Sequence, residues 1–146
     1  MSILFFSKSP EYGWLSNFSE DPFTLNGIRW QSVEHYYQAH KYVGTEAMDR
    51  IRHAETPAKA RKAGQDRSLV TRPDWEQVKQ DVMKQAVRAK FDQNRRRREQ
   101  LLATGDEELI HTSESDLFWG RNQEGTGENR LGEILMEIRA ALRNSA

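Results

Sequence analysis

A tight turn signal stands near the start of the chain, between two short apolar runs. Asn26-Gly27 separates 23–25 from 28–30, and Asn-Gly is typical of a two-residue β-hairpin because both turn residues must adopt positive φ. A few residues later the pattern becomes helical, with Ser32 placed to cap a helix and Glu34 in its first turn. The chain must therefore combine short strands with helices, and we predict an α+β fold.

Most of the remaining chain has a helical pattern. Start and stop signals predict helices that follow Thr45, run from Thr56-Pro57 to Gly64, open at Pro73-Asp74-Trp75, span about 94–104, and follow the capping residue Asn129. Further short strands are expected at 3–6 and 109–112. The prediction is a single helix-rich domain, residues 1–146, with a small antiparallel sheet.

Composition excludes several classes of function. The 22 basic and 22 acidic side chains cancel, so no global field favours nucleic acid, and the basic run Arg95–Arg98 is most simply a solvated helix face. The absence of cysteine removes disulfides, thiolate metal sites and thiol nucleophiles. Without an apolar run long enough to span a bilayer or a secretory signal, we expect a soluble, cytoplasmic protein that has no membrane partner.

Two patterns could be taken for ligand sites. His35 and His40 are five residues apart, so they miss the i,i+4 spacing of a helical zinc site, and we expect no metal. Gly125-x-Gly127 lacks the strand and the further glycine of a dinucleotide fingerprint. It is either an ordinary glycine loop or a turn that presents backbone N–H groups and the Asn129 helix N-terminus to a phosphate.

Carboxylates stand beside aromatic rings in two segments, 30–41 and 116–120. Such combinations suit a pocket that binds a flat ring and acts on a charged or protonatable bond. Glu34, Gln38 and Lys41 share roughly one helix face. The alternatives are that Glu34 only favours the helix dipole, that His35 only packs, and that Trp119 only fills the core.

Several motifs together resemble a known family. They are Trp14-Leu-Ser16-Asn17-Phe18, Trp30-x-Ser32-x-Glu34-His35-x-x-Gln38-Ala39-x-Lys41, Asp116-x-x-Trp119-Gly120 and Gly125-x-Gly127-x-Asn129-x-Leu131-Gly132. Their order and spacing, from about Phe5 to Leu142, resemble the YbiA-like branch of the NADAR (NAD and ADP-ribose) superfamily. Phe6 and Leu15 depart from that pattern.

The resemblance implies an N-glycosidase that needs no cofactor. Such enzymes hydrolyse the N-glycosidic bond of phosphorylated ribosylamino-pyrimidine intermediates of riboflavin synthesis and release ribose 5-phosphate, which pre-empts metabolite damage. Other members of the superfamily act on ADP-ribosyl linkages, including ADP-ribosylated guanine. The expected partner is thus a small phosphorylated riboside, with nucleic acid entering only as an ADP-ribosylated substrate, and the oligomeric state stays open.

The chemistry of that reaction assigns a role to each candidate residue. An oxocarbenium-like sugar needs a carboxylate to stabilise it and a base or acid to complete the exchange. We expect Glu34 and Asp116 to be catalytic, with interchangeable roles, and Trp119 to stack on the base. The expected substrate-binding set is completed by Asn17, His35, Lys41, Arg67, Gly120, Gly127 and Asn129, with Lys41, Arg67 and the 125–129 turn placed for the phosphate.

Two other functions fit parts of the pattern. A catalytically silent module that binds ADP-ribose or a nucleotide would keep Trp119 and the glycine turn and would not need Glu34. An RNA-binding protein that uses Arg95–Arg98 would lose affinity steeply with salt. The intact Glu34-His35 pair favours the enzyme over the binding module.

Overall fold

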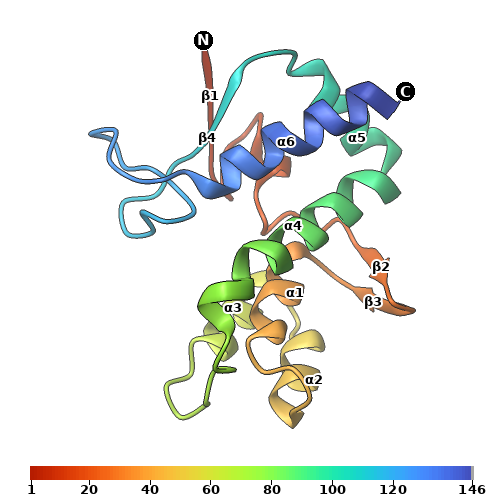
Figure 1. Cartoon of the computed structure of the whole chain (residues 1–146), viewed down its shortest axis with the longest axis vertical. Helices are drawn as coiled ribbons and strands as arrows, with labels where there is room; N and C mark the ends of the chain where they lie inside the picture. The colour runs from red at the N-terminus through yellow and green to blue at the C-terminus, as the bar shows by residue number, and fades with distance from the viewer. Residues whose placement is uncertain (146) are drawn as a thin grey trace. The chain divides into compact units, whose positions relative to one another are not determined.

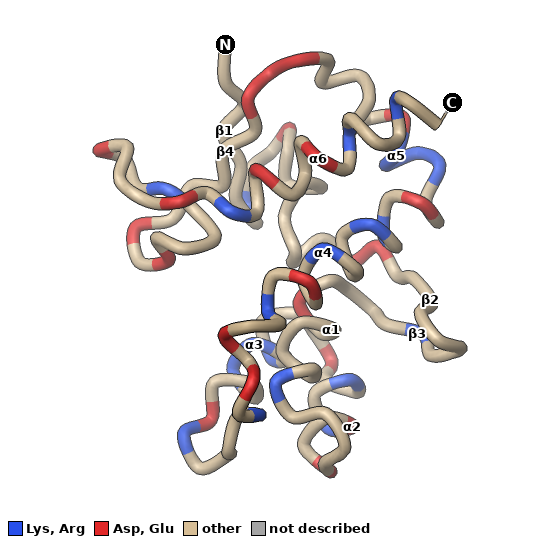
Figure 2. The backbone as a smooth tube through the Cα atoms, in the orientation of Figure 1, with Lys and Arg blue, Asp and Glu red and all other residues tan. Residues whose placement is uncertain are grey.

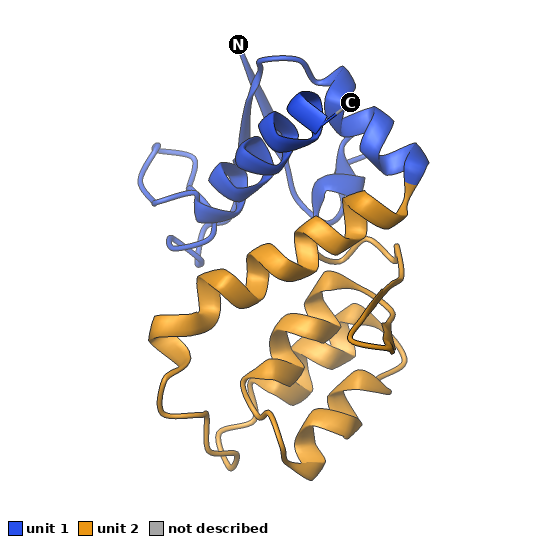
Figure 3. Ribbon diagram, turned by 45° about the vertical axis from the view of Figure 1, so that its right-hand side comes forward, with its two compact units in different colours: residues 1–16, 95–146 blue, residues 17–94 orange. Residues whose placement is uncertain are grey.

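The computed structural model describes residues 1–145 (Figure 1). In chain order the elements are β1 (Ser2–Phe5), the 3-10 helix η1 (Gly13–Leu15), β2 (Phe23–Leu25), β3 (Ile28–Trp30), α1 (Val33–His40), α2 (Glu46–Arg52), α3 (Pro57–Gly64), α4 (Trp75–Gln93), α5 (Arg95–Ala103), β4 (Glu108–His111) and α6 (Arg130–Ser145). These elements form two compact units (Figure 3). Unit 1 contains residues 1–16 and the chain from 95 onward, and unit 2 contains residues 17–94.

Unit 2 begins with the predicted hairpin. β2 and β3 pair antiparallel, with Phe23 opposite Trp30. The turn residues Asn26 and Gly27 have φ angles of 53° and 78°, as a type I′ turn requires. The side-chain amide of Gln93 hydrogen-bonds to the backbone of β2. It accepts a hydrogen bond from Thr24 N (2.8 Å) and donates one to Thr24 O (2.7 Å). The hairpin prediction is confirmed.

The helices of unit 2 start where their capping residues predicted. Ser32 Oγ accepts a hydrogen bond from His35 N at the start of α1, and Thr56 Oγ1 accepts one from Lys59 N at the start of α3. Thr45 precedes α2 without capping it, since its hydroxyl donates instead to Tyr42 O. α1 is buried along nearly its whole length and contacts α2, α3 and α4. It is therefore the helix around which unit 2 packs.

The core of unit 2 is rich in aromatic side chains. Trp30 and Tyr36 pack edge to face, with their ring centroids 5.0 Å apart, and Tyr37 packs against Trp75 at 5.1 Å. α4 follows the predicted helical period, and of its expected apolar residues only Val78 is half-exposed; Trp75, Val82, Ala86 and Phe91 are buried. These contacts hold α1 rigidly against α4.

Unit 1 contains a second sheet that the sequence did not predict as such. β1 and β4 pair in parallel, with Ile3 opposite Leu109 and Phe5 opposite His111. α6 packs on β4, and α5 packs on α6. Leu109 O comes so close to Gly132 of α6 that any side chain at this position would clash with it. The α+β prediction is confirmed, but the sheet pairs are one antiparallel and one parallel.

Charged residues of both signs are interspersed along the described chain (Figure 2). The basic run at the start of α5 is exposed or half-exposed, and Arg95 forms an ion pair with Glu99 (3.2 Å). Such pairs at i,i+4 are ordinary features of solvated helix faces. None of the helices in residues 1–145 is long and apolar enough to cross a membrane.

Candidate active site

Glu34 is a buried carboxylate of unit 2. It lies in the first turn of α1, where the helix dipole favours negative charge, and only 6% of its surface is exposed. Gln38, one turn along the same helix, donates a hydrogen bond from Nε2 to Glu34 Oε2 (2.7 Å). A charge is retained at such a buried position only when polar partners offset its desolvation. Glu34 is therefore a buried carboxylate fixed by a hydrogen bond, which is the arrangement expected of a catalytic carboxylate.

Asn17 connects the loop before the hairpin to this carboxylate. Its backbone carbonyl accepts a hydrogen bond from Glu34 N (3.2 Å), and its side-chain amide donates to Met83 Sδ (3.4 Å). A thioether is a weak acceptor, so the amide could exchange this partner for a substrate group at little cost. The structure thus brings Asn17 to the start of α1 beside Glu34, as the sequence prediction needs.

Lys41 lies at the C-cap of α1, next to other cations. Its Nζ lies 5.7 Å from the centroid of the Tyr37 ring. Burial lowers the pKa of Lys41, the nearby Glu34 carboxylate opposes that shift, and the positive charges of Arg61 and Lys79 lower the pKa further. We call Lys41, Arg61 and Lys79 the basic cluster; it draws on α1, α3 and α4. An anion placed there would relieve the repulsion among these cations.

Arg61 and Lys79 were not predicted as site residues. Lys79 lies one turn after Trp75, whose ring packs on Tyr37, and this contact brings Lys79 to the end of α1. The signal in the sequence was the i,i+4 spacing of Trp75 and Lys79, but it becomes informative only when the partner of Trp75 is known.

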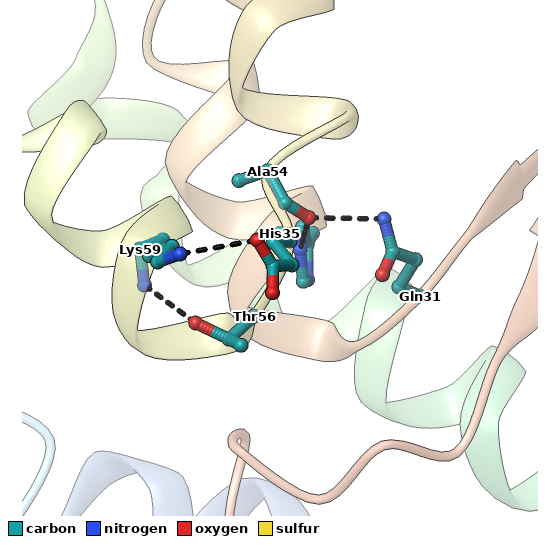
Figure 4. A network of polar contacts seen from close by, with 6 residues as sticks. Gln31, His35, Ala54, Thr56 and Lys59 are labelled. Carbon is teal, nitrogen blue, oxygen red and sulfur yellow. Dashed lines mark hydrogen bonds and ion pairs between the residues drawn. The ribbon is translucent and has the colours of Figure 1, made fainter.

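His35 is a structural residue in this fold. It has no exposed surface. Its Nε2 lies 3.0 Å from Ala54 O (Figure 4). Its Nδ1 lies 2.7 Å from Ser32 Oγ. Because a carbonyl can only accept, Nε2 carries the proton and Nδ1 accepts from the Ser32 hydroxyl. Both ring nitrogens therefore bind the chain itself, and a direct substrate contact of His35 stays a prediction.

Arg67 lies in the exposed segment after α3. In residues 1–145 it forms no ion pair with the neighbouring carboxylates Asp66 and Glu76. Asp66 accepts hydrogen bonds from the backbone and hydroxyl of Ser68 (2.9 and 2.8 Å), and Glu76 pairs with Lys79. A phosphate contact of Arg67 stays a prediction.

Asp116, in unit 1, caps a turn of the backbone. Its Oδ1 accepts hydrogen bonds from Trp119 N (2.9 Å) and Phe118 N (3.2 Å), while its own N–H donates to Ser113 Oγ. The side chain is half-buried. One carboxylate oxygen is thus committed to structure, and any contact with a substrate or water would fall to Oδ2.

Trp119 follows in the same turn and is 7% exposed. Its ring packs edge to face against Phe118, with centroids 4.8 Å apart and an angle of 89° between the planes. The next residue, Gly120, is required by the chain itself: an added Cβ would lie 2.7 Å from His111 O. β4 therefore makes a close approach to Gly120, and a substrate contact of this glycine stays a prediction.

The glycine turn before α6 is held by its own hydrogen bonds. The N–H groups of residues 128–131 donate to the carbonyls of residues 117, 120, 118 and 119. Gly127, with a φ of 129°, packs so closely on residues 120 and 121 that an added Cβ would lie 2.9 Å from Arg121 Cα. The N–H groups at the start of α6 are therefore engaged by the chain itself, and a phosphate contact of the 125–129 turn stays a prediction.

Asn129 caps α6 by position but not with its side chain. Its carbonyl accepts from Glu133 N, while its amide donates to Leu109 O and accepts from His111 N (both 2.9 Å). The φ of 51° turns the side chain toward β4. Substrate contacts of Gly127 and Asn129 remain predictions, now without a free amide or side chain at Asn129 to make them.

The predicted site residues divide between the two units. Asn17, Glu34, His35, Lys41 and Arg67 belong to unit 2, and Asp116, Trp119, Gly120, Gly127 and Asn129 belong to unit 1. Within unit 2 the structure gathers Asn17, Glu34 and Lys41 around α1, and Arg67 is exposed after α3. In residues 1–145 no group of His, Asp and Glu side chains is arranged to hold a metal ion.

Comparisons with known proteins match nearly the whole chain. Residues 4–143 match the family model described as the NADAR domain. The N-glycosidase YbiA of Escherichia coli is 43% identical over 140 residues, which cover 96% of this chain and 88% of that protein. A riboflavin biosynthesis protein of Vibrio vulnificus is 40% identical over 144 residues, 99% of this chain and 39% of that protein. The NMR structure of E. coli YbiA matches with a TM-score of 0.90 at 41% identity, covering 99% of this chain and 88% of that one.

Proposed function

The chain belongs to the NADAR family, and from this membership we propose that it is an N-glycosidase of phosphorylated ribosylamino-pyrimidines. It would hydrolyse the bond between ribose and the amino-pyrimidine and release ribose 5-phosphate. The observation that carries the proposal is the buried Glu34 carboxylate, held by Gln38 at the start of α1. The similarity to N-glycosidase YbiA over 96% of this chain supports the reaction class.

Glu34 is the residue we place at the anomeric carbon. Breaking a ribosyl C–N bond generates positive charge on the sugar, and a buried carboxylate stabilises that charge more strongly than an exposed one. Glu34 could equally activate the attacking water. Asp116 suits either task less well because its Oδ1 already accepts two backbone hydrogen bonds. We therefore assign Asp116 the supporting role, in which Oδ2 orients the water or binds a ribose hydroxyl.

Other residues would bind the phosphate and the base of the substrate. We place the 5-phosphate at the basic cluster of Lys41, Arg61 and Lys79, in which Lys79 also pairs with Glu76. Arg67 and the 125–129 turn stay predicted as further phosphate contacts. Trp119 would stack on the pyrimidine, a contact worth about 1–3 kcal/mol per base in other proteins. Asn17 would donate its amide to the base or the ribose.

The substrate class rests on the relatives. A riboflavin biosynthesis protein of V. vulnificus contains a segment similar to this whole chain, which supports ribosylamino-pyrimidine phosphates from that pathway as substrates. Hydrolysing these reactive intermediates would limit the damage they cause. A cytoplasmic location would suit that role and stays a prediction.

Two alternative functions lead to different outcomes. A hydrolase of ADP-ribosyl linkages, including ADP-ribosylated guanine, would use the same carboxylates on a larger substrate. A binding module for ADP-ribose would bind without turnover and would tolerate the loss of the Glu34 charge. The buried, held carboxylate favours the two hydrolases over the module, because a binding module gains nothing from it.

The test is liquid chromatography with mass detection on purified protein. The substrates are the two ribosylamino-pyrimidine phosphates, NAD, ADP-ribose and an ADP-ribosylated guanine nucleotide. We expect ribose 5-phosphate from the pyrimidines only, and a fall of about 100-fold or more in kcat for Glu34→Gln, as for loss of other acid–base or charge-stabilising groups. The matched control is Glu46→Gln, which changes an exposed carboxylate in the first turn of α2 and should leave kcat unchanged.

Other outcomes would redirect the assignment. Turnover of the ADP-ribosyl substrates alone would identify the second hydrolase activity. Binding of ADP-ribose without turnover of any substrate would identify the module. Full activity of Glu34→Gln on the pyrimidines would keep the reaction but remove Glu34 from it.

A further inference from the structure

We propose that Gln38 positions the Glu34 carboxylate for the reaction and keeps it ionised. Gln38 acts through Glu34 and needs no contact with the substrate. The inference rests on the proposed function, in which Glu34 is catalytic, and it adds a residue to which neither the sequence pattern nor the relatives assign a role.

Gln38 lies four residues after Glu34 on α1, so the two side chains are neighbours on one helix face. The distance from Gln38 Nε2 to Glu34 Oε2 is 2.7 Å, at the short end of the range for N–H···O hydrogen bonds. Gln38 is 3% exposed, so water does not compete for this contact.

The orientation of the Gln38 amide is set by Glu34. Gln38 Oε1 is buried and has no hydrogen-bond partner in residues 1–145. A buried amide is normally turned to satisfy both its ends. Turning this amide over would set its oxygen against the carboxylate oxygen of Glu34. The carboxylate alone therefore selects the orientation, and the oxygen is left unbonded as a consequence.

Packing against α3 restricts the Gln38 side chain to this position. Gly64, at the end of α3, packs directly on the Gln38 side chain, and the three atoms nearest to an added Cβ all belong to Gln38. The Tyr42 hydroxyl donates to Gly64 O and holds that end of α3 against α1. The amide is thus confined between Glu34 and the backbone of α3.

Together these contacts favour the ionised form of Glu34 and fix its orientation. A donor on the ionised form favours the charge over the protonated acid. It also restricts rotation of the carboxylate, which keeps the reacting oxygen in register with the sugar, and a misplacement of about 1 Å can cost about 100-fold in rate.

The experiment compares Gln38→Met with the wild type. Methionine has a similar length and no amide donor, so the fold should survive while the hydrogen bond to Glu34 is lost. We expect kcat to fall about 10- to 100-fold, with KM little changed, and the acid limb of the pH profile of kcat to move to higher pH. Gln38→Glu should move that limb further, because a second carboxylate repels the first.

The control is Gln31→Met. Gln31 also donates its side-chain amide to backbone carbonyls, those of Arg52 and Ala54, and not to a carboxylate. The Gln31→Met substitution should lower the melting temperature and leave the pH profile of kcat unchanged. This separates a positioning role from a merely structural one.

Three results would decide the matter. A wild-type pH profile and kcat in folded Gln38→Met would overturn the positioning role. A loss of kcat without a shift of the acid limb in either Gln38 variant would also overturn it, since a structural defect would suffice. If Glu34→Gln stays fully active, the failure lies in the assignment of Glu34 and not in Gln38.

Discussion

Two adjacent residues, Glu34 and His35, have different tasks although the sequence presents them as a pair. Successive residues of an α-helix are separated by about 100° around its axis, because there are about 3.6 residues per turn. Glu34 therefore faces Gln38, while His35 faces Ser32 and Ala54. The carboxylate belongs to the candidate site and the imidazole to the structure that supports α1.

The buried histidines predict how stability depends on pH. Burial lowers the pKa of both His35 and His40 from the usual value of 6.5, although backbone hydrogen bonds oppose the shift and Arg72 adds to it at His40. Below pH 6.5 the unfolded chain binds protons that the folded chain does not bind. The free energy of unfolding should therefore fall as the pH decreases from about 6.5 to the lowered pKa values.

Urea denaturation between pH 7.5 and 5 measures this dependence. His35→Gln removes one of the titrating groups and should flatten the loss of stability over that range, whatever it does to stability at pH 7.5. His53→Gln is the control, because His53 lies at the exposed end of α2. An equal slope in the wild type and His35→Gln would show that His35 is not the group responsible.

At the scale of elements, the contact between α1 and α3 decides the shape of the Glu34 site. Gly64 is helical, so alanine there would by itself favour the helix by about 1 kcal/mol. An added Cβ would, however, lie 2.8 Å from Gln38 Cβ and 2.9 Å from Gln38 Cδ. We expect Gly64→Ala to cost about 1–3 kcal/mol of stability through overpacking, and to lower activity by displacing Gln38.

Chemical denaturation together with kcat tests this contact. Ala63→Gly is the matched control, since it changes the preceding residue of α3 in the opposite sense and should cost about 1 kcal/mol through helix propensity alone. A Gly64→Ala protein that is more stable than the wild type would mean that α1 and α3 can separate freely, and the confinement of Gln38 would then be wrong.

The turn before α6 uses its backbone N–H groups for structure. Glycines and a helix N-terminus are a common anion site, because the first N–H groups of a helix have no partner within it. Here the N–H groups of residues 128–131 donate to carbonyls of the 117–120 turn, which Asp116 caps. The same sequence signal thus serves to pin the 116–120 turn to α6.

At the scale of the molecule, the start of the chain is an integral part of the fold. β1 pairs with β4, more than a hundred residues later, and Phe5 is fully buried in that pairing. Phe5→Ala should therefore cost about 3–5 kcal/mol, as for large-to-small changes in other cores. The neighbouring Phe6 is 45% exposed, and Phe6→Ala should change stability by no more than about 0.5 kcal/mol.

Thermal and urea unfolding of the two variants measure the difference. Because Phe5 and Phe6 are adjacent and chemically identical, the comparison isolates burial from composition. Equal, small losses in both variants would mean that β1 is not docked on β4 in solution.

The sequence by itself determined the local elements and the family. Asn26-Gly27, Ser32 and Thr56-Pro57 act through bonds and backbone angles within a few residues, so the hairpin and the helix starts could be read directly. The motifs that resemble the NADAR family depend only on order and spacing. The candidates Glu34, Asn17 and Lys41 were also found in this way, because they lie on or beside a single helix.

Only the tertiary structure decided which groups are already occupied. The parallel pairing of β1 with β4, the contact of Gly64 with Gln38, and the bonds that engage His35, Asp116 and the amides before α6 all join segments that are distant in sequence. Local pattern carries no information about such partners. A polar group is available for chemistry only if the folded chain has not already bound it, and that is a property of packing.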